Sequence, residues 1–133
     1  MPRPPSEHPT ELELQILKIL WEQSPQTARQ IRERLEQIGR KLAHTSVITT
    51  LQKMVDKRQL KQLDAIEGKA LRFSPQIKER DVSQRMLADL VDRVFDGFAE
   101  AVMLRLFDVS ELDESAVKRM RRALNDKMRE KQS

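Results

Sequence analysis

Cysteine is absent from the 133 residues, which excludes disulfide bonds and any metal or redox site built on thiolates. No apolar run approaches the roughly 20 residues needed to cross a bilayer, and no glycine-rich phosphate loop occurs. The only histidines, His8 and His44, have no acidic residues at metal-ligand spacing. We therefore expect no metal, no cofactor, no enzymatic activity and no membrane insertion, and the lack of cysteine suits a reducing cytoplasm.

Glycine, proline and aromatic residues are also scarce, with three glycines, six prolines and 4% aromatics. Strong helix formers such as Leu, Glu, Lys, Arg and Gln take their place, which favours a mainly α protein with little β structure. Residues 1–8 contain three prolines and lack the apolar segment of a signal peptide. We expect this stretch to be a short disordered arm.

The net charge of +4 is unevenly distributed along the chain. Residues 1–80 carry a net +5, residues 81–133 a net −1, and residues 29–61 hold nine basic against three acidic side chains. Such a local excess is typical of a surface that binds nucleic-acid phosphates. A solvated helical surface that is merely basic is the alternative interpretation.

Two capping boxes mark the starts of the first two predicted helices. Thr10 with Glu13, and Thr27 with Gln30, have the spacing at which each side chain bonds the other residue's backbone N–H. Apolar residues then recur at helical spacing, and Gly39 is a natural residue to end the second helix. The apolar positions are Leu12, Ile16, Ile19 and Leu20 in the first helix, and Ala28, Ile31, Leu35 and Ile38 in the second.

Residues 45–57 predict a third helix with two unlike faces. Its buried stripe consists of Val47, Leu51, Met54 and Val55. The opposite face carries hydroxyls and one cation, with no acidic residue before the last turn, so it can approach DNA bases and phosphates without repulsion. We predict that Thr45, Ser46 and Thr49 contact bases, because hydroxyls donate and accept and threonine methyls can meet thymine; Thr50 is included in the same surface.

A basic β-hairpin is predicted directly after this helix. Residues 60–66 and 70–74 flank a turn at residues 67–69, and Leu63, Ala65, Leu71 and Phe73 alternate as half-buried strand residues do. A recognition helix followed by such a hairpin indicates a winged helix-turn-helix DNA-binding domain over residues 9–78. The predicted phosphate contacts are Arg40, Lys41 and Lys53 around the helix, with Lys69 and Arg72 as phosphate or minor-groove contacts on the hairpin.

Residues 79–133 predict a helical domain with more apolar surface than it can cover alone. Folding back on the first domain or lining a small-molecule pocket would cover this surface. We favour a homodimer, because a DNA-binding protein of this size needs two half-sites for useful specificity. The predicted dimerisation residues are Leu87, Leu90, Val94, Phe95, Phe98, Leu106, Met120 and Leu124.

Four stretches together carry a resemblance to a known family: residues 11–21, 27–31, 45–60 and 67–75. Over residues 8–131 the chain resembles the penicillinase-repressor family of winged-helix repressors. The resemblance implies a homodimer that binds an inverted-repeat operator in double-stranded DNA and represses antibiotic-resistance or cell-envelope stress genes. It also implies a membrane sensor that triggers cleavage in the dimerisation domain, with Arg105 and Leu106 at the candidate cleavage point.

The chain departs from the family pattern in several respects, including Ile48, which stands where an arginine or glutamine is common. Ala43 and His44 replace a Ser-Pro pair before the recognition helix, so the usual cap is missing. Arg58 replaces a glycine after that helix, where a left-handed turn would cost about 1 kcal/mol. Residues 104–107 lack the Asn-Phe pair of the known cleavage point.

A helical adaptor that uses its winged-helix domain to bind another protein is the alternative function.

Overall fold

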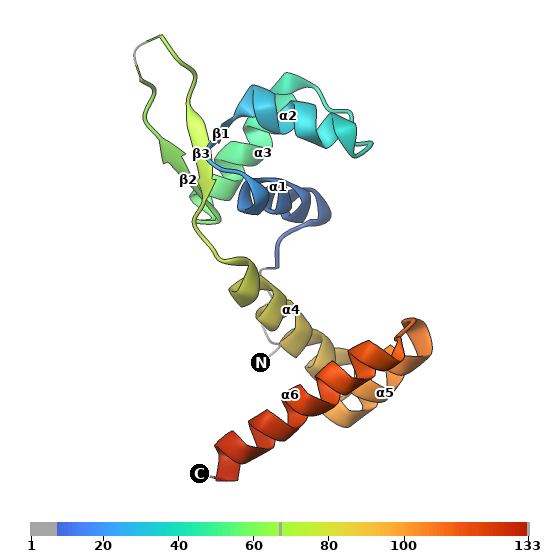
Figure 1. Ribbon diagram of the computed structural model, residues 1–133. Helices are drawn as coiled ribbons and strands as arrows, with labels where there is room; N and C mark the ends of the chain where they lie inside the picture. Colours follow the sequence, from blue (N-terminus) through green and yellow to red (C-terminus); the bar gives the residue numbers. More distant parts are fainter. Residues whose placement is uncertain (1–7, 67, 133) are drawn as a thin grey trace, which may run out of the picture. The chain divides into compact units, whose positions relative to one another are not determined.

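The computed structural model describes residues 8–66 and 68–132, so residues 1–7 of the expected disordered arm lie outside the described residues. The described part of the chain contains six helices and three strands, which are labelled in Figure 1. In chain order they are α1 (Glu11–Glu22), β1 (Gln26–Thr27), α2 (Ala28–Gln37), α3 (His44–Asp56), β2 (Leu60–Leu63), β3 (Arg72–Pro75), α4 (Glu79–Val94), α5 (Ala99–Val109) and α6 (Glu114–Gln132).

Both predicted capping boxes are present. The Glu13 N–H donates to the Thr10 hydroxyl at 3.2 Å, and the Glu13 carboxylate accepts from the Thr10 N–H at 2.9 Å. Thr27 and Gln30 repeat the arrangement at 3.2 and 2.8 Å. Because these bonds satisfy N–H groups that a helix start leaves free, α1 and α2 begin directly after the two threonines.

A single apolar core joins α1, α2, α3 and the hairpin strands. It contains Ile16, Leu17, Ile19, Leu20, Ile31, Leu35, Val47, Leu51, Met54, Leu60 and Phe73. Ile38, predicted to continue the buried stripe of α2, is instead 56% exposed. Ile38 occupies the C-cap of α2, where the chain leaves the helix, and Gly39 follows at a φ of +89°. The helical periodicity therefore no longer applies at Ile38.

The three strands form one antiparallel sheet in the order β1, β3, β2. The hairpin strands are shorter than predicted: pairing ends at Leu63 and Arg72, and Ala65 and Leu71 beyond that pair are exposed. The alternation predicted for these two residues is wrong because no sheet continues there to cover them. Strand β1, only two residues long, was not predicted. Glu67 of the predicted turn lies outside the described residues.

The order α1, β1, α2, α3, β2, β3 is that of a winged helix-turn-helix domain. In it α2 and α3 are the helix-turn-helix pair and the β2–β3 hairpin is the wing (Figure 1). The predicted fold class, mainly α with a small sheet, is confirmed.

The chain divides into two compact units, one ending at Asp89 and the other beginning at Leu90, so helix α4 belongs to both. The second unit contains the end of α4 with α5 and α6. Asp113 caps the start of α6, its carboxylate accepting from the Ala116 N–H at 2.7 Å. Within this unit Val102 is the one buried hydrophobic residue among those described, so its helices leave most of their apolar side chains uncovered.

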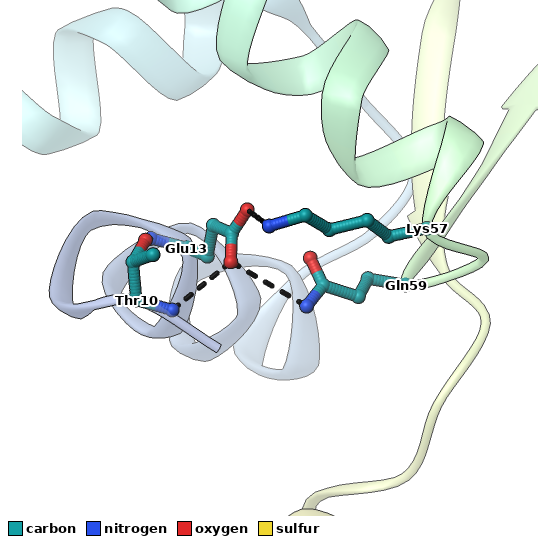
Figure 2. Close-up of polar contacts among 4 residues, drawn as sticks. All are labelled: Thr10, Glu13, Lys57 and Gln59. Atoms are coloured by element: carbon teal, nitrogen blue, oxygen red, sulfur yellow. Dashed lines mark hydrogen bonds and ion pairs between the residues drawn. The ribbon is translucent and has the colours of Figure 1, made fainter. Parts of the chain in front are cut away.

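A buried carboxylate ties the start of α1 to the end of α3. Glu13 is 3% exposed, and its carboxylate accepts from Lys57 Nζ at 2.8 Å and lies 3.5 Å from the Gln59 amide nitrogen (Figure 2). Between Lys57 and Gln59, Arg58 adopts a φ of +62°, the left-handed turn expected from the sequence. Strained residues of this kind persist where their surroundings determine the chain path. Here the side chains on both sides of Arg58 are held by Glu13.

Opposing effects set the pKa of the Glu13 carboxyl. Burial raises the pKa, but the hydrogen bond and charge of Lys57, the Thr10 N–H and the Gln59 amide outweigh it, so the pKa lies below its ordinary value of 4.5. A carboxyl whose pKa is lower in the folded than in the unfolded chain stabilises the fold above the unfolded pKa. That contribution is lost as the pH falls through the folded-state pKa.

We expect Glu13→Gln to lower the free energy of unfolding at pH 7 by about 1–3 kcal/mol, because it removes the charge that Lys57 and Gln59 contact inside the protein. The difference from wild type should shrink as the pH falls below 4.5, and urea unfolding at several pH values measures it. Glu11→Gln, in the same helical turn but exposed, is the matched control. Equal, pH-independent effects of the two substitutions would contradict the assignment.

Candidate nucleic-acid interface

Helix α3 has the two faces that its sequence predicts. Val47, Leu51 and Met54 are fully buried in the core. Thr45, Ser46, Thr49 and Lys53, all predicted DNA contacts, are exposed, and Thr50 is half-buried. The helix packs on α2 and on β2, and these contacts hold its exposed face in position.

Two of the four hydroxyls are already engaged within the helix. Thr49 Oγ1 donates to the Thr45 carbonyl and Thr50 Oγ1 donates to the Ser46 carbonyl, both at 2.9 Å. A hydroxyl has one proton, so in this conformation these two oxygens can only accept a further hydrogen bond. The expectation that Thr49 both donates and accepts is therefore corrected: it offers an acceptor oxygen and a methyl group. An amino group of adenine or cytosine and the methyl of thymine are the matching base features.

The N-terminus of α3 is open. Its N-cap, Ala43, makes no side-chain cap bond, and the first turn contains no acidic residue. The first N–H groups of a helix have no partner within it, and the helix dipole makes this end positive. This is the usual setting in which a helix binds a phosphate. The lack of an N-cap side chain at Ala43, which the sequence also indicates, therefore leaves the first N–H groups of α3 free to bind an anion.

The cations next to α3 lie in different settings. Lys41 and Lys53 are exposed and form no ion pair with any residue that the structure describes. Arg40 is half-buried, and its Nε donates to Gln15 Oε1 of α1 at 3.0 Å. This bond holds the guanidinium against α1. No local pattern points to this role of Gln15, which lies 25 positions from Arg40 in the chain.

The hairpin cations are also separated. Arg72 is the half-buried first residue of the central strand β3, facing Thr27 and Leu63 in the register, whereas Lys69 is exposed in the loop beyond the strands. Neither residue forms an ion pair or side-chain hydrogen bond within the described ranges. The structure thus places them on the wing, the element predicted for them, without bringing them into contact with α3.

The apolar residues predicted for dimerisation are mostly exposed. Phe95 is half-buried; the others are exposed, namely Leu87, Leu90, Val94, Phe98, Leu106, Met120 and Leu124. Leu104 and Val109, which were not predicted, are 60% and 72% exposed on α5. Arg105 and Leu106, the candidate cleavage point, are exposed in the middle of the same helix.

Across residues 8–66 and 68–132, no group of three or more His, Asp or Glu side chains could hold a metal ion. None of the helices in that part of the chain is long and apolar enough to cross a membrane.

The match to a family profile agrees with the resemblance seen in the sequence. The chain matches the sequence profile of the family described as "Penicillinase repressor" over residues 9–126. Among solved structures it is similar to a mutant of Lactococcus lactis ZitR, with 16% identity and a TM-score of 0.44, covering 96% of this chain and 80% of that one. The search of curated proteins found no match.

The family profile spans both units of the structure, from the turn before α1 into α6. With a winged helix-turn-helix in the first unit and an exposed, acid-free hydroxyl face on α3, the chain belongs to the penicillinase repressor family, a family of DNA-binding transcriptional repressors.

Proposed function

We propose that this protein represses transcription as a homodimer that binds an inverted-repeat operator. Helix α3 enters the major groove, with Thr45, Ser46 and Thr49 contacting base edges. Lys41, Lys53 and the open N-terminus of α3 contact phosphates on either side, and the wing contributes Lys69 and Arg72. The observation that carries this proposal is the exposed hydroxyl face of α3, which contains no acidic residue before Asp56 at its end and lies next to an uncapped helix start.

The electrostatics of the first unit support DNA as the partner. A base edge requires groups that can come within hydrogen-bond distance without an electrostatic penalty from nearby phosphates. The exposed side chains of α3 meet this requirement up to Asp56, its last residue. An adaptor that binds protein would gain no advantage from excluding carboxylates from this face, so we favour the repressor.

The apolar surface of the second unit supports dimerisation. Monomeric proteins rarely expose a large contiguous apolar patch unless it is an interaction site. Here leucines, phenylalanines and methionines of α4, α5 and α6 are between a third and three-quarters exposed. One α3 helix contacts only a few base pairs, so two copies related by a twofold axis are needed for an operator to compete with other DNA.

The family resemblance supplies the regulated genes and the switch. We propose control of antibiotic-resistance or cell-envelope stress genes, with a membrane sensor that leads to cleavage at Arg105–Leu106. A cut there would separate α6 from the first half of α5 and remove apolar contacts from the dimer. Because both residues lie inside α5, a protease must act on a locally unwound form of the helix.

Substitutions in α3 should separate base contacts from phosphate contacts. We expect Thr49→Ala and Ser46→Ala each to weaken operator binding by about 1–2 kcal/mol while leaving random DNA nearly unaffected. Lys53→Ala, Lys69→Ala and Arg72→Ala should weaken binding to both DNAs and reduce its dependence on salt. Fluorescence anisotropy with an operator duplex and a scrambled duplex measures both effects; identical behaviour of all five variants on the two DNAs would refute the assignment.

Two further variants identify the group on Thr49 that is read. Thr49→Val keeps a methyl and removes the oxygen, whereas Thr49→Ser keeps the oxygen and removes the methyl. A loss confined to Thr49→Val indicates an amino group as the partner, and a loss confined to Thr49→Ser indicates a thymine methyl. Circular dichroism of both variants checks that α3 is intact after the bond to the Thr45 carbonyl is changed.

The dimer interface is tested by placing a charge in it. Leu90→Asp or Leu124→Asp would bury an unpaired carboxylate on association, so either variant should sediment as a monomer at micromolar concentration and bind the operator at least a hundred-fold more weakly. Ile38→Asp, an equally exposed apolar site outside the second unit, should leave sedimentation unchanged. Wild-type protein that sediments as a monomer yet binds its operator tightly would overturn the proposal.

The cleavage switch is tested in cells challenged with a cell-wall antibiotic. We expect full-length protein to disappear from immunoblots as the target genes turn on, with fragments that end near Arg105. The double substitution Arg105→Ala and Leu106→Ala changes the candidate cleavage point but preserves helix propensity, so it should slow the loss of full-length protein. Arg105→Pro is not suitable for this comparison because it would disrupt α5 itself. Full-length protein that persists while the genes are expressed would exclude cleavage.

A further inference from the structure

A cavity of about 760 Å³ lies in the first unit, away from the exposed face of α3. Its walls come from four places: His8 and Pro9, the end of α3 and the residue before β2, the segment after β3, and the first two turns of α4. Trp21 Nε1 of α1 donates to the Ile77 carbonyl at 2.9 Å, which fastens the segment after β3 to α1. The volume is in the range of small-molecule sites in proteins.

One wall of the cavity holds a buried acceptor with no partner. Gln59 is 7% exposed and its Oε1 makes no hydrogen bond, while its Nε2 is directed to Glu13. The backbone of Gln59 is fixed at both ends, since its N–H donates to the Met54 carbonyl at 2.8 Å and its carbonyl accepts from the Gln76 N–H at 2.9 Å. Buried polar atoms in proteins are nearly always satisfied. This oxygen therefore suits an occupant that brings an O–H or N–H group.

The opposite wall is cationic. Lys78 directly precedes α4, Val82 and Arg85 lie in its first two turns, and all three line the cavity. Neither Lys78 nor Arg85 forms an ion pair with a described residue, and Asp81 is the one acidic side chain in the described lining. Lys57, a third cation there, is engaged with Glu13. Two exposed cations without ion-pair partners among the described residues thus line the same half-open cavity as the fixed acceptor.

We infer that this cavity binds a small organic anion that carries a hydroxyl group. The acid group is held by Arg85 and Lys78, because a guanidinium and an ammonium together match a carboxylate or phosphate. The hydroxyl donates to Gln59 Oε1, and Pro9, Ile77 and Val82 cover the carbon skeleton. An occupant of this size contacts the residues that follow the recognition helix and the first turns of α4 at the same time.

Such contacts give the ligand a route to the DNA-binding surface. Lys57 and Gln59 follow α3 directly, and both are bonded to Glu13. A ligand that binds one arrangement of α3 and α4 better than another shifts the population toward that arrangement, so it changes operator affinity. This regulatory step rests on the proposed repressor function; the binding itself does not.

Calorimetry on the full chain tests the site with three hydroxylated anions as probes: citrate, malate and glucose 6-phosphate. Tricarballylate and succinate are citrate and malate without the hydroxyl, and sodium chloride matches the ionic strength. We expect at least one probe to bind with a submillimolar Kd. If that probe is citrate or malate, its analogue without the hydroxyl should bind at least ten-fold more weakly. Arg85→Gln and Lys78→Gln should each weaken binding at least ten-fold. Arg80→Gln, on the same helix but outside the lining, should not.

Absence of binding by all three probes would overturn the inference, as would equal binding by wild type and Arg85→Gln. The regulatory step is measured separately, as the change in operator Kd caused by the bound probe. We expect a change of at least five-fold in wild type and none in Arg85→Gln. Binding without such a change overturns the regulatory step alone, whereas failure to bind any operator would overturn the proposed function and leave the calorimetric result standing.

Discussion

The buried carboxylate of Glu13 is the contact on which the geometry of the first unit depends. Three short helices cannot be stable alone, and their shared core, which includes Leu60 of β2 and Phe73 of β3, packs the hairpin against them. Glu13 holds the connection between α3 and the hairpin by bonding the residues on both sides of the left-handed turn at Arg58. Gln59 then pairs through its backbone with Gln76. One carboxylate at the start of α1 thus holds the turn from which the wing begins.

Local patterns in the sequence predicted much of this fold because their physical causes are local. The capping boxes involve residues three apart, and the stripe of Val47, Leu51 and Met54 reflects only the period of a helix. Contacts between distant segments could not be read in the same way. Nothing near Glu13 in the sequence points to Lys57, 44 positions later, and the two residues of β1 are too few to show any alternation. The strands were predicted too long because alternation continues beyond the residues that have a partner strand.

The candidate DNA-binding surface shows the same limit at the scale of single atoms. The residue types of α3 predicted which of its side chains face outward, and the side chains exposed in the structure are the predicted ones. They could not predict that the Thr49 hydroxyl donates its hydrogen bond to the Thr45 carbonyl, since this depends on a side-chain rotamer. Nor could they show that Arg40 is held by Gln15. These bonds decide which base features can be read and which cations are free to move onto a phosphate, so specificity depends on details that composition does not contain.

The two units divide the physical tasks of a repressor. The first concentrates positive charge and hydroxyls, which in the proposed function provide affinity for DNA and discrimination between bases. The second concentrates exposed apolar side chains, which in the same proposal favour association. Helix α4 belongs to both units, so any event that alters it can affect both tasks. A cut in α5 would act on association and could not be reversed. A ligand against Lys78 and Arg85 would act on the first unit and would leave when its concentration fell. The chain therefore has room for two switches that differ in reversibility: one works through the apolar contacts of the dimer, and the other through the charged start of α4.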